Sequence, residues 1–316
     1  MYCPYLYGAQ SELLALRDYA KNHPNDRVLS PIIEPTKANV SNLATCLRQL
    51  SSNGILASVV LNPGQDELSS SQAQRTWYQN FSHQLTAFVD YIPAYKTNAA
   101  IGYADIDLFL NAYPAGAVVI HASSHLSLGN FQSVDQDARV RWNVVLPGSI
   151  NPPQRNTLSA HKTIDIEDRF TVQQRNADYG APEFFSNQFH TYQQYAVGYG
   201  DYTVLSTLPP SSGGQPGAVA IHLTYKDSQA GGVWIEHFVS ALTQRSQGDV
   251  AGKYHDAATQ LVSAANSRPA EFGNNPALIS YQQQVANIHF PGLPTNKRQQ
   301  ILHHLCLNRQ MATGQI

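Results

Sequence analysis

Residues 56–64, Leu56-Ala57-Ser58-Val59-Val60-Leu61-Asn62-Pro63-Gly64, decide the fold class of this chain. The apolar run from Leu56 to Asn62 is typical of a buried β-strand, and Pro63-Gly64 ends it with a turn. A helical pattern precedes this strand over 42–50, and another follows it over 72–91. A buried strand between two helices is the repeating unit of a parallel α/β sheet.

The same alternation extends through the first two-thirds of the chain. A helix is expected over 11–19, and a strand over 28–34 is stopped by Pro35. Further strands are expected over 99–105, 117–121, 142–146 and 163–167, with a helix over 106–113 between the first two. Six strands in this rhythm, mostly about 20 to 40 residues apart, favour a TIM-like barrel over an open sheet.

The alternation stops after residue 168. Residues 169–216 are polar, aromatic and rich in glycine, and the stretch is too long for an ordinary connection, so we expect a long insertion there. The apolar runs 218–225 and 233–239 lie too close together for a crossover helix, which predicts an antiparallel hairpin at about 218–239. Helices are expected over 250–265 and 295–311. We therefore predict a single domain over 1–316: an α/β, TIM-barrel-like fold, distorted or completed by the hairpin, with C-terminal helices within 250–311.

The chain is poor in charge. Asp, Glu, Lys and Arg make up 13% of the 316 residues, roughly half the usual share. A formal net charge of -2 and a pI near 6.6 give no electrostatic footprint for nucleic acid or a membrane surface. The three cysteines are odd in number and far apart in sequence, which argues against a disulfide framework and a zinc–thiolate site. The N-terminus lacks a signal-peptide pattern and no long apolar run spans a bilayer, so we expect a cytoplasmic protein.

Polar residues recur where the expected strands end, and ligands of parallel α/β folds collect at those carboxyl ends. Glu34, Asn62, Asp105, His121 and Asp168 occupy such positions. Each has a structural alternative, because Glu34 precedes a proline and Asn62-Pro63-Gly64 is a good turn by itself. As a set they predict a pocket at the barrel mouth. Neighbouring carboxylates there suit an acid–base pair or a divalent metal, which is the candidate cofactor.

The segment that follows the last expected strand gathers further charges. Arg175-Asn176-Ala177-Asp178-Tyr179 places a guanidinium, an amide and a carboxylate within five residues. An Arg fork can hold phosphate or carboxylate in two-point geometry, whereas the alternative is an Arg175–Asp178 pair that pins the loop. Gly198-Tyr199-Gly200-Asp201-Tyr202 would let the backbone approach a ligand closely. It lacks the spacing of a P-loop or a dinucleotide fingerprint.

Two histidines lie in the predicted hairpin. His222 and His237 stand on its two strands and could meet across the pair. Two histidines with a carboxylate would suit a transition metal. The alternative is that both are hydrogen-bonded residues of the core or wall.

Motifs in order along most of the chain support a family resemblance. They begin with Tyr2-x-Pro4-Tyr5-Leu6-x-Gly8, Pro31-Ile32-Ile33-Glu34-Pro35 and Leu61-Asn62-Pro63, and the most specific are Asp168-x-Phe170, Arg175-Asn176-Ala177-Asp178-Tyr179 and Gly200-Asp201-Tyr202. Later matches are 218–225, His237-Phe238-Val239-Ser240, Lys253 and the segment from Gly292 to His304. This set resembles the phage and bacterial beta-protein family, in particular its bacterial branch, which is often encoded beside a small nuclease-like protein. The resemblance implies a link to phage defence or mobile-element conflict, with that neighbour or a phage protein as partner. It implies no reaction.

Two classes of function stay open. An enzyme would be a hydrolase of a phosphoester or nucleotide-like substrate, with Glu34, Asp168 and His222 as catalytic groups. Its substrate-binding residues would be Asn62, Arg175, Asn176, Asp178, Asp201 and His237. A non-catalytic recognition or partner protein would instead present the tyrosines of 169–216 as a contact surface, with Arg175 and Asp178 paired internally. We favour an anionic-ligand site at the carboxyl ends of the barrel strands, enzymatic or not.

Overall fold

The computed structural model describes residues 1–85, 89–123, 125–205 and 216–316. The chain groups into two compact units, and each is described by itself. The first unit holds residues 1–168 and 191–202, and the second holds 169–190 and 203–316. The expectation of a single domain over 1–316 stays a prediction.

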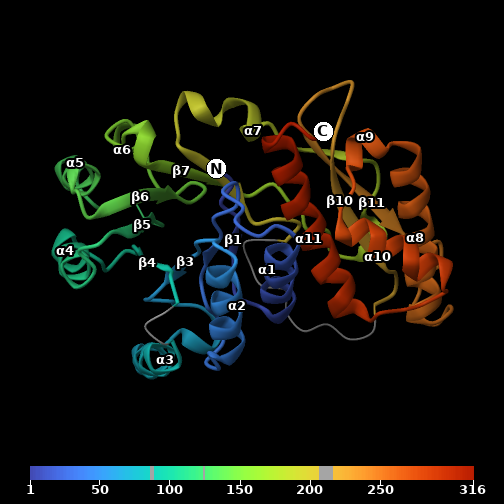
Figure 1. The fold of residues 1–316 in the computed structure, drawn as a ribbon, viewed down its shortest axis with the longest axis horizontal. Helices are drawn as coiled ribbons and strands as arrows, with labels where there is room; N and C mark the ends of the chain where they lie inside the picture. The colour runs from blue at the N-terminus through green and yellow to red at the C-terminus, as the bar shows by residue number, and fades with distance from the viewer. Residues whose placement is uncertain (86–88, 124, 206–215) are drawn as a thin grey trace. The chain divides into compact units, whose positions relative to one another are not determined.

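The first unit is an eight-stranded parallel sheet, nearly closed into a barrel by a bridge between Tyr2 and Tyr199. Its strands, in sheet order, are β1 (Tyr5–Leu6), β2 (Ile32–Ile33), β3 (Ser58–Val60), β4 (Ile92–Lys96), β5 (Ala117–His121), β6 (Val140–Val145), β7 (Thr163–Glu167) and β9 (Gly198–Asp201). The helices between them lie outside the strands (Figure 1): α1 (Gln10–Asn22), α2 (Ser41–Ser52), α3 (Ser71–Gln84), α4 (Tyr103–Ala112), α5 (Leu128–Gln136) and α6 (Pro152–Arg155). The TIM-barrel-like prediction is therefore confirmed.

Strands β3 and β5 are buried along their whole length, on both faces, which explains their continuous apolar runs in the sequence. In β5, Val118 and Ile120 belong to a cluster with residues from strands β1 to β7. The intervening Ala117 and Val119 belong instead to a cluster that includes residues of α4 and α5. Successive side chains of a strand point to opposite faces, so one set fills the barrel and the other packs beneath the helices.

Two expected elements of the first unit differ from the structure. The strand predicted over 99–105 is wrong, because β4 lies at 92–96 and α4 already begins at Tyr103. Pro93 conceals β4, since proline is rarely found inside a central strand. Asp105 consequently lies in the first turn of α4, where it accepts a hydrogen bond from the Gly102 amide at 2.8 Å, and not at a strand end. The helix predicted over 72–91 ends at Gln84, and residues 86–88 of that prediction lie outside the described residues.

The segment 169–216 holds the last strand of the barrel, β9, as well as β8 (Glu183–Ser186); its residues 206–215 are outside the part that the structure describes. The Cys3 amide donates to the Tyr199 carbonyl at 2.8 Å, so β9 meets the N-terminal residues. A Cβ atom on Gly200 would lie 1.9 Å from the Cys3 carbonyl oxygen. The close backbone approach that the glycines of 198–200 permit is thus an approach to the chain's own N-terminal segment, and not to a ligand.

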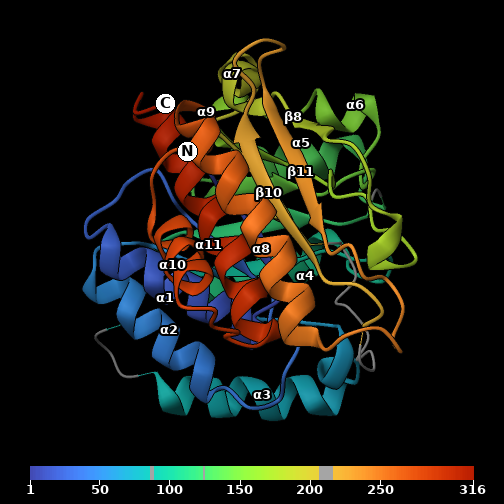
Figure 2. The same cartoon turned by 90° about the vertical axis from the view of Figure 1, so that its right-hand side faces the viewer.

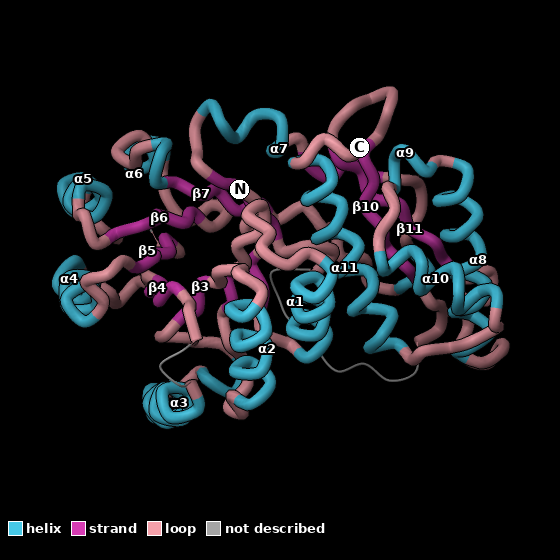
Figure 3. Tube along the Cα trace, viewed as in Figure 1, coloured by secondary structure: helices cyan, strands magenta, loops and turns pink. Residues whose placement is uncertain are grey.

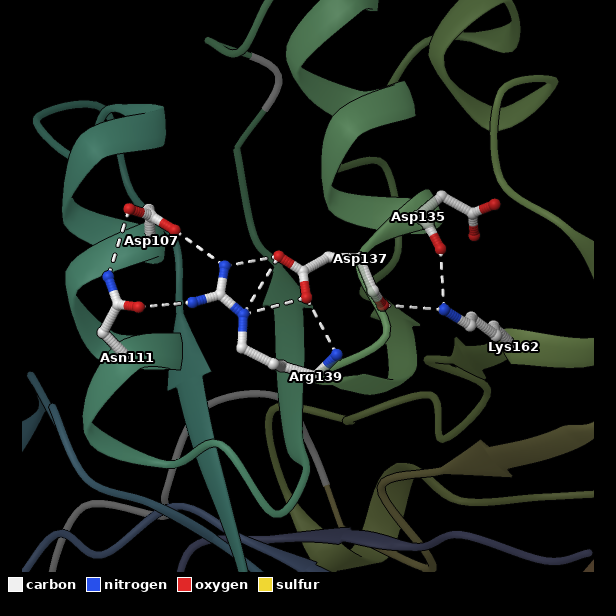
Figure 4. Close-up of polar contacts among 6 residues, drawn as sticks. All are labelled: Asp107, Asn111, Asp135, Asp137, Arg139 and Lys162. Carbon is white, nitrogen blue, oxygen red and sulfur yellow. Dashed lines mark hydrogen bonds and ion pairs between the residues drawn. The ribbon is translucent and has the colours of Figure 1, made fainter.

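A charged network fixes the start of β6 to helix α4 (Figure 4). Arg139, which precedes β6, donates to carboxylate oxygens of Asp137 at 2.5 Å and Asp107 at 2.7 Å. Its hydrogen bonds lower the pKa of Asp137. Lys162 donates to the main-chain carbonyls of Asp135 and Asp137 at the end of α5, where the helix dipole favours a cation. These charges lie at the amino ends of the strands and serve the scaffold.

The second unit is a three-stranded antiparallel sheet of order β10-β11-β8 with helices packed on it. Strands β10 (Ala220–Lys226) and β11 (Val233–Val239) form the predicted hairpin, and β8 pairs with β11. Helices α8 and α11 pack on the hairpin strands, and α10 packs on α8 and α11 (Figure 2). Figure 3 distinguishes these helices from the strands by colour. The helices are α7 (Gln188–Thr191), α8 (Val250–Ser267), α9 (Pro269–Phe272), α10 (Pro276–Ala286) and α11 (Leu293–Ala312). Both expected C-terminal helices are confirmed, as α8 and α11.

Helix α11 brings polar groups to the hairpin. The Gln300 side-chain oxygen accepts a hydrogen bond from the His222 amide at 3.0 Å. The His303 ring contacts the Thr224 carbonyl through Nε2 at 2.8 Å. Across the described ranges, no helix combines the length and the apolar character that crossing a bilayer requires.

We predict that Gly200→Ala strongly destabilises the barrel. The added methyl group cannot coexist with the Cys3 carbonyl, so β9 or the N-terminal segment must move, at a cost of about 3 kcal/mol in the free energy of unfolding. Urea unfolding measures this cost. Gly64→Ala is the matched control, because a Cβ atom there meets nothing within 4 Å. Equal unfolding midpoints for the two variants would contradict the role assigned to this contact.

Candidate functional site

The carboxyl ends of the barrel strands carry the polar groups that define a candidate site in the first unit. Because the eight strands are parallel, these ends meet at one edge of the sheet. Glu34 follows β2, Asn62 follows β3, Lys96 ends β4 and Asp168 follows β7.

Glu34 is the buried centre of this edge. Its side chain has no exposed surface, and the Tyr5 hydroxyl donates to its Oε2 at 2.6 Å. The Lys96 ammonium donates to both carboxylate oxygens, at 2.9 and 2.7 Å, while the Lys96 side chain stays 20% exposed. A carboxylate buried in a barrel is tolerated only when it is paired and hydrogen-bonded. Glu34, Lys96 and Tyr5 therefore form one charge-neutral unit with its cation toward the accessible side.

Asn62 positions Lys96. Its Nδ2 donates to the Lys96 carbonyl at 2.8 Å, and its Oδ1 accepts from the Lys96 amide at 2.9 Å. This two-point contact extends the β3–β4 pairing by one side chain and fixes the backbone of Lys96. The amide predicted to bind substrate is thus engaged with the main chain of the neighbouring strand.

Three tyrosines surround the Glu34–Lys96 pair. Tyr5 lies 5.3 Å from Tyr202 between ring centroids, and Tyr7 stacks on Tyr202 at 6.1 Å with an interplanar angle of 15°. Burial raises the pKa of all three phenols, and nearby Glu34 adds to the rise. Asp168 also raises the pKa of Tyr202, which places its charge near that ring. The phenols are therefore neutral hydrogen-bond donors at any physiological pH.

The two acidic residues predicted from 168–202 differ in environment. Asp168 is exposed directly after β7. Asp201 is 3% exposed, and its Oδ1 accepts from the Tyr2 hydroxyl at 2.8 Å. Burial, followed by Asp201, raises the pKa of Tyr2. Asp201 thus holds the N-terminal segment against β9, whereas Asp168 is accessible to a ligand.

His121 ends β5 but lies within the apolar core. It is fully buried, its Nε2 is 3.0 Å from Asn143 Oδ1, and its ring stacks on Phe131. Burial lowers its pKa to about 4. The geometry therefore favours a structural role for His121 in the core over a role in ligand binding.

The other five predicted residues belong to the second unit. Arg175 donates through Nε and Nη2 to the Asp178 carboxylate, at 2.6 Å for the shortest contact, and this pair is exposed. Their mutual hydrogen bonds favour the charged form of both side chains, so the pKa of Arg175 is raised and that of Asp178 is lowered. Asn176 Nδ2 donates to the Ala218 carbonyl at 2.9 Å. The motif is therefore a self-paired turn tied to the start of the hairpin.

His222 and His237 meet across β10 and β11, as the hairpin predicts. Their Nδ1 atoms are 2.8 Å apart, so one ring donates and the other accepts. Tyr179 packs on both rings, with centroids 4.4 and 4.8 Å away. Burial lowers the pKa of His222 to about 3 and also lowers that of His237. The nearest carboxylate oxygen to His237 Nε2 is that of Glu183, at 4.0 Å.

The structure therefore sorts the nine predicted residues into separate groups. Glu34 and Asn62 both contact Lys96, whereas Arg175, Asn176 and Asp178 share one turn and His222 pairs with His237. Among the described residues, no group of three or more His, Cys, Asp or Glu side chains is arranged to hold a metal ion.

Sequence reasoning missed Lys96 and the three tyrosines. Lys96 ends the strand that Pro93 concealed, and the apolar side chains of Ile92 and Ala94 were the available signal. Tyr5 lies in a strand of two residues, which is too short to show a period.

Comparison with protein-family models and with curated protein sequences gives no match to this chain. The resemblance to the beta-protein family accordingly stays a prediction.

Loss of Lys96 should leave Glu34 buried without a partner. We predict that Lys96→Met lowers the free energy of unfolding by about 3 kcal/mol, and that Glu34→Gln/Lys96→Met recovers most of this loss because no buried charge remains. Urea unfolding of the two variants and the wild type measures both effects. A single variant as stable as the wild type would show that the pair is not the buried centre of this edge.

The buried histidines predict that the second unit loses stability in mild acid. The folded-state pKa values of His222, about 3, and His303, about 4, lie below the unfolded value of about 6.5. The unfolded chain therefore binds protons first, so stability falls as the pH drops from about 6.5 toward 4, by about 2 kcal/mol for each such histidine at pH 5.

Urea unfolding at about pH 8 and about pH 5, roughly 1.5 units above and below the unfolded pKa of about 6.5, tests this dependence. His222→Asn should reduce the slope, whereas replacement of exposed His125 by Asn should leave it unchanged. A wild-type stability independent of pH over this range would rule out neutral buried histidines.

Proposed function

We propose that the protein binds a small molecule carrying a phosphoester or similar anionic group at the carboxyl end of its barrel strands. The observation that carries the proposal is the buried Glu34–Lys96–Tyr5 unit at that edge, with Lys96 partly exposed. In barrels of this type, polar groups at the carboxyl ends of strands serve ligands, whereas those at the amino ends serve stability. The fold alone does not define a reaction, so the proposal rests on the site.

Recognition would depend on donated hydrogen bonds. A lysine ammonium has three N–H groups; Glu34 is the partner of Lys96 in the described chain and occupies two of them, so one is left for a ligand. The Tyr202 phenol stays protonated and adds a donor beside it. Phosphoester oxygens accept such bonds. Because Glu34 already neutralises Lys96, we expect affinity at this site to depend only weakly on salt.

If the ligand is turned over, Asp168 is the better candidate for accepting a proton. Asp168 is exposed at the end of β7, whereas the side chain of Glu34 has no exposed surface. A divalent cation would reach Asp168 together with ligand oxygens, as in hydrolysis of phosphoesters. The resemblance to the beta-protein family extends the proposal to a cytoplasmic role in phage defence or mobile-element conflict.

A non-catalytic recognition protein that acts with a nuclease-like neighbour or senses a phage protein is the second candidate. One observation favours it: Arg175 is paired internally with Asp178, as expected for a recognition protein of this kind. Another argues against a tyrosine contact surface. Tyr195 is 36% exposed, but the other tyrosines described within 169–216 are partly or fully buried: Tyr179, Tyr192, Tyr199 and Tyr202.

A ligand panel tests the first proposal. Nucleotides and sugar phosphates, each with and without Mg²⁺, are added to the protein, and a ligand that raises the melting temperature is titrated by calorimetry. We predict that Tyr202→Phe weakens its binding about tenfold, because a hydrogen bond to a charged group is lost while the ring still stacks on Tyr7. Asp168→Ala should reduce any turnover while leaving binding in place.

Tyr195→Phe is the matched control, since it removes an exposed phenol from the same unit. A ligand bound equally well by the Tyr202→Phe and Tyr195→Phe variants would place the binding site elsewhere. No thermal response across the panel, together with capture of the nuclease-like neighbour, would favour the recognition protein.

A further inference from the structure

A hollow of about 670 Å³ lies in the second unit, and none of the residues that line it belongs to the barrel end. Three segments line it: 174–178, 216–218 and 243–245. Its volume falls in the range of small-molecule sites. The lining is mainly polar, and the Arg175–Asp178 turn described above forms one wall.

The charge of this lining is positive. Arg175 and Arg245 contribute two guanidinium groups, and Asp178 contributes the one carboxylate of the described lining. Arg175 contacts Asp178 through Nε and Nη2, which leaves both hydrogens of its Nη1 for a ligand. Arg245 is exposed and has no ion pair or side-chain hydrogen bond within the described residues. Two guanidinium groups against one carboxylate give the lining a net positive charge, which favours an anion.

A buried cation lies behind the same wall. Lys253 is 2% exposed, and its ammonium donates to the main-chain carbonyl of Gln244, a residue of the lining, at 2.7 Å. It has no carboxylate within ion-pairing distance in the portion of the chain that is described. The nearby Asp249 carboxylate instead caps helix α8 by accepting from the Gly252 amide.

The position of Lys253 in helix α8 adds a further unfavourable interaction for its positive charge. It lies one turn into α8, close to the end at which the helix dipole is positive and disfavours a cation. A buried ammonium without a counter-charge costs free energy that an anion held nearby would recover. The ammonium is therefore a second observation, independent of the arginines, that points to a negatively charged occupant.

The three lining segments are held together before any ligand arrives. Asn176 is hydrogen-bonded to the Ala218 carbonyl, and Lys253 holds Gln244. A Cβ atom on Gly217 would lie 2.6 Å from the Thr243 carbonyl oxygen, so the backbones of the segments 216–218 and 243–245 are in direct contact. A site that is already assembled loses little conformational entropy on binding.

We infer that this hollow is an anion-binding site for a phosphorylated small molecule, separate from the ligand site of the barrel. Arg175 and Arg245 contact the phosphoryl oxygens. Lys253 is a positioning residue that orients Gln244 and supplies buried positive charge. The inference does not depend on the function proposed for the barrel end, because none of its residues belongs to that edge.

Inorganic phosphate and inorganic pyrophosphate are the probes, titrated by calorimetry into the full chain at low salt and again at physiological salt. We expect saturable binding that weakens as salt is added, since the arginines are exposed and their charge is screened. Arg245→Ala should weaken binding about tenfold. Lys226→Ala, which removes one positive charge elsewhere in the same unit, should bind as the wild type does.

Two further variants separate a ligand site from a structural turn. Asp178→Asn frees the Arg175 fork and removes the opposing charge, so binding should tighten by about threefold or more. Lys253→Met removes an uncompensated buried charge, so the melting temperature without phosphate should rise by a few degrees while phosphate binding weakens. A lysine with a purely structural role would give the opposite change in melting temperature.

The inference is overturned if Arg245→Ala binds pyrophosphate as tightly as the wild type, or if Lys253→Met lowers the melting temperature without affecting binding. Tyr202→Phe, which tests the barrel end, should leave binding of phosphate to this hollow unchanged. The two proposals can therefore fail separately.

Discussion

The barrel depends on the hydrogen bonds that join its first three residues to its last strand. The Cys3 amide bonds to the Tyr199 carbonyl, and the Tyr199 amide bonds to the Met1 carbonyl. The Tyr2 hydroxyl adds a side-chain bond to Asp201. Without these contacts the sheet would have two open edges with unpaired backbone groups. With them, the ends of β2, β4 and β7 lie on one rim, which is the condition for Glu34, Lys96 and Asp168 to serve a common site.

The two units treat buried charge in different ways. In the barrel, the carboxylate of Glu34 is matched by Lys96 and by a phenol, so the edge is nearly neutral and directs hydrogen bonds outward. In the second unit, Lys253 is buried beside a wall that already carries an excess of positive charge. On the two proposals, the first arrangement would select a ligand by the placement of its acceptors, and the second would select it by charge. Added salt should therefore weaken binding at the second proposed site more than at the first.

Much of the fold could be predicted from the sequence because buried parallel strands have a strong apolar signature. The runs at 56–62 and 117–121 each proved to be barrel strands, and the spacing of two apolar runs defined the hairpin. The strands that escaped prediction lack that signature: β1 has two residues, β4 contains Pro93, and β9 is glycine-rich because it touches the N-terminal segment.

The site could be predicted only as far as the strands were. Glu34 was found because it follows a recognisable strand, and the pairing of His222 with His237 followed from the hairpin register. Lys96 could not be found, because its position at a strand end becomes visible only once β4 is known. The partners of buried groups, such as Tyr5 for Glu34, are set by contacts between distant parts of the chain that no local pattern encodes.

The interleaving of the two units also constrains how the protein is made. The chain passes between the units at residues 168–169, 190–191 and 202–203, so neither unit is a continuous segment. During synthesis at roughly 5 to 20 residues per second, β8 is complete about 3 to 10 seconds before its partner β11 has been made. The N-terminal residues wait longer, about 10 to 40 seconds, before β9 exists to pair with them. The nascent chain therefore carries two unpaired strand edges on the ribosome, and shielding them is a task for chaperones or for slow, ordered folding of the barrel.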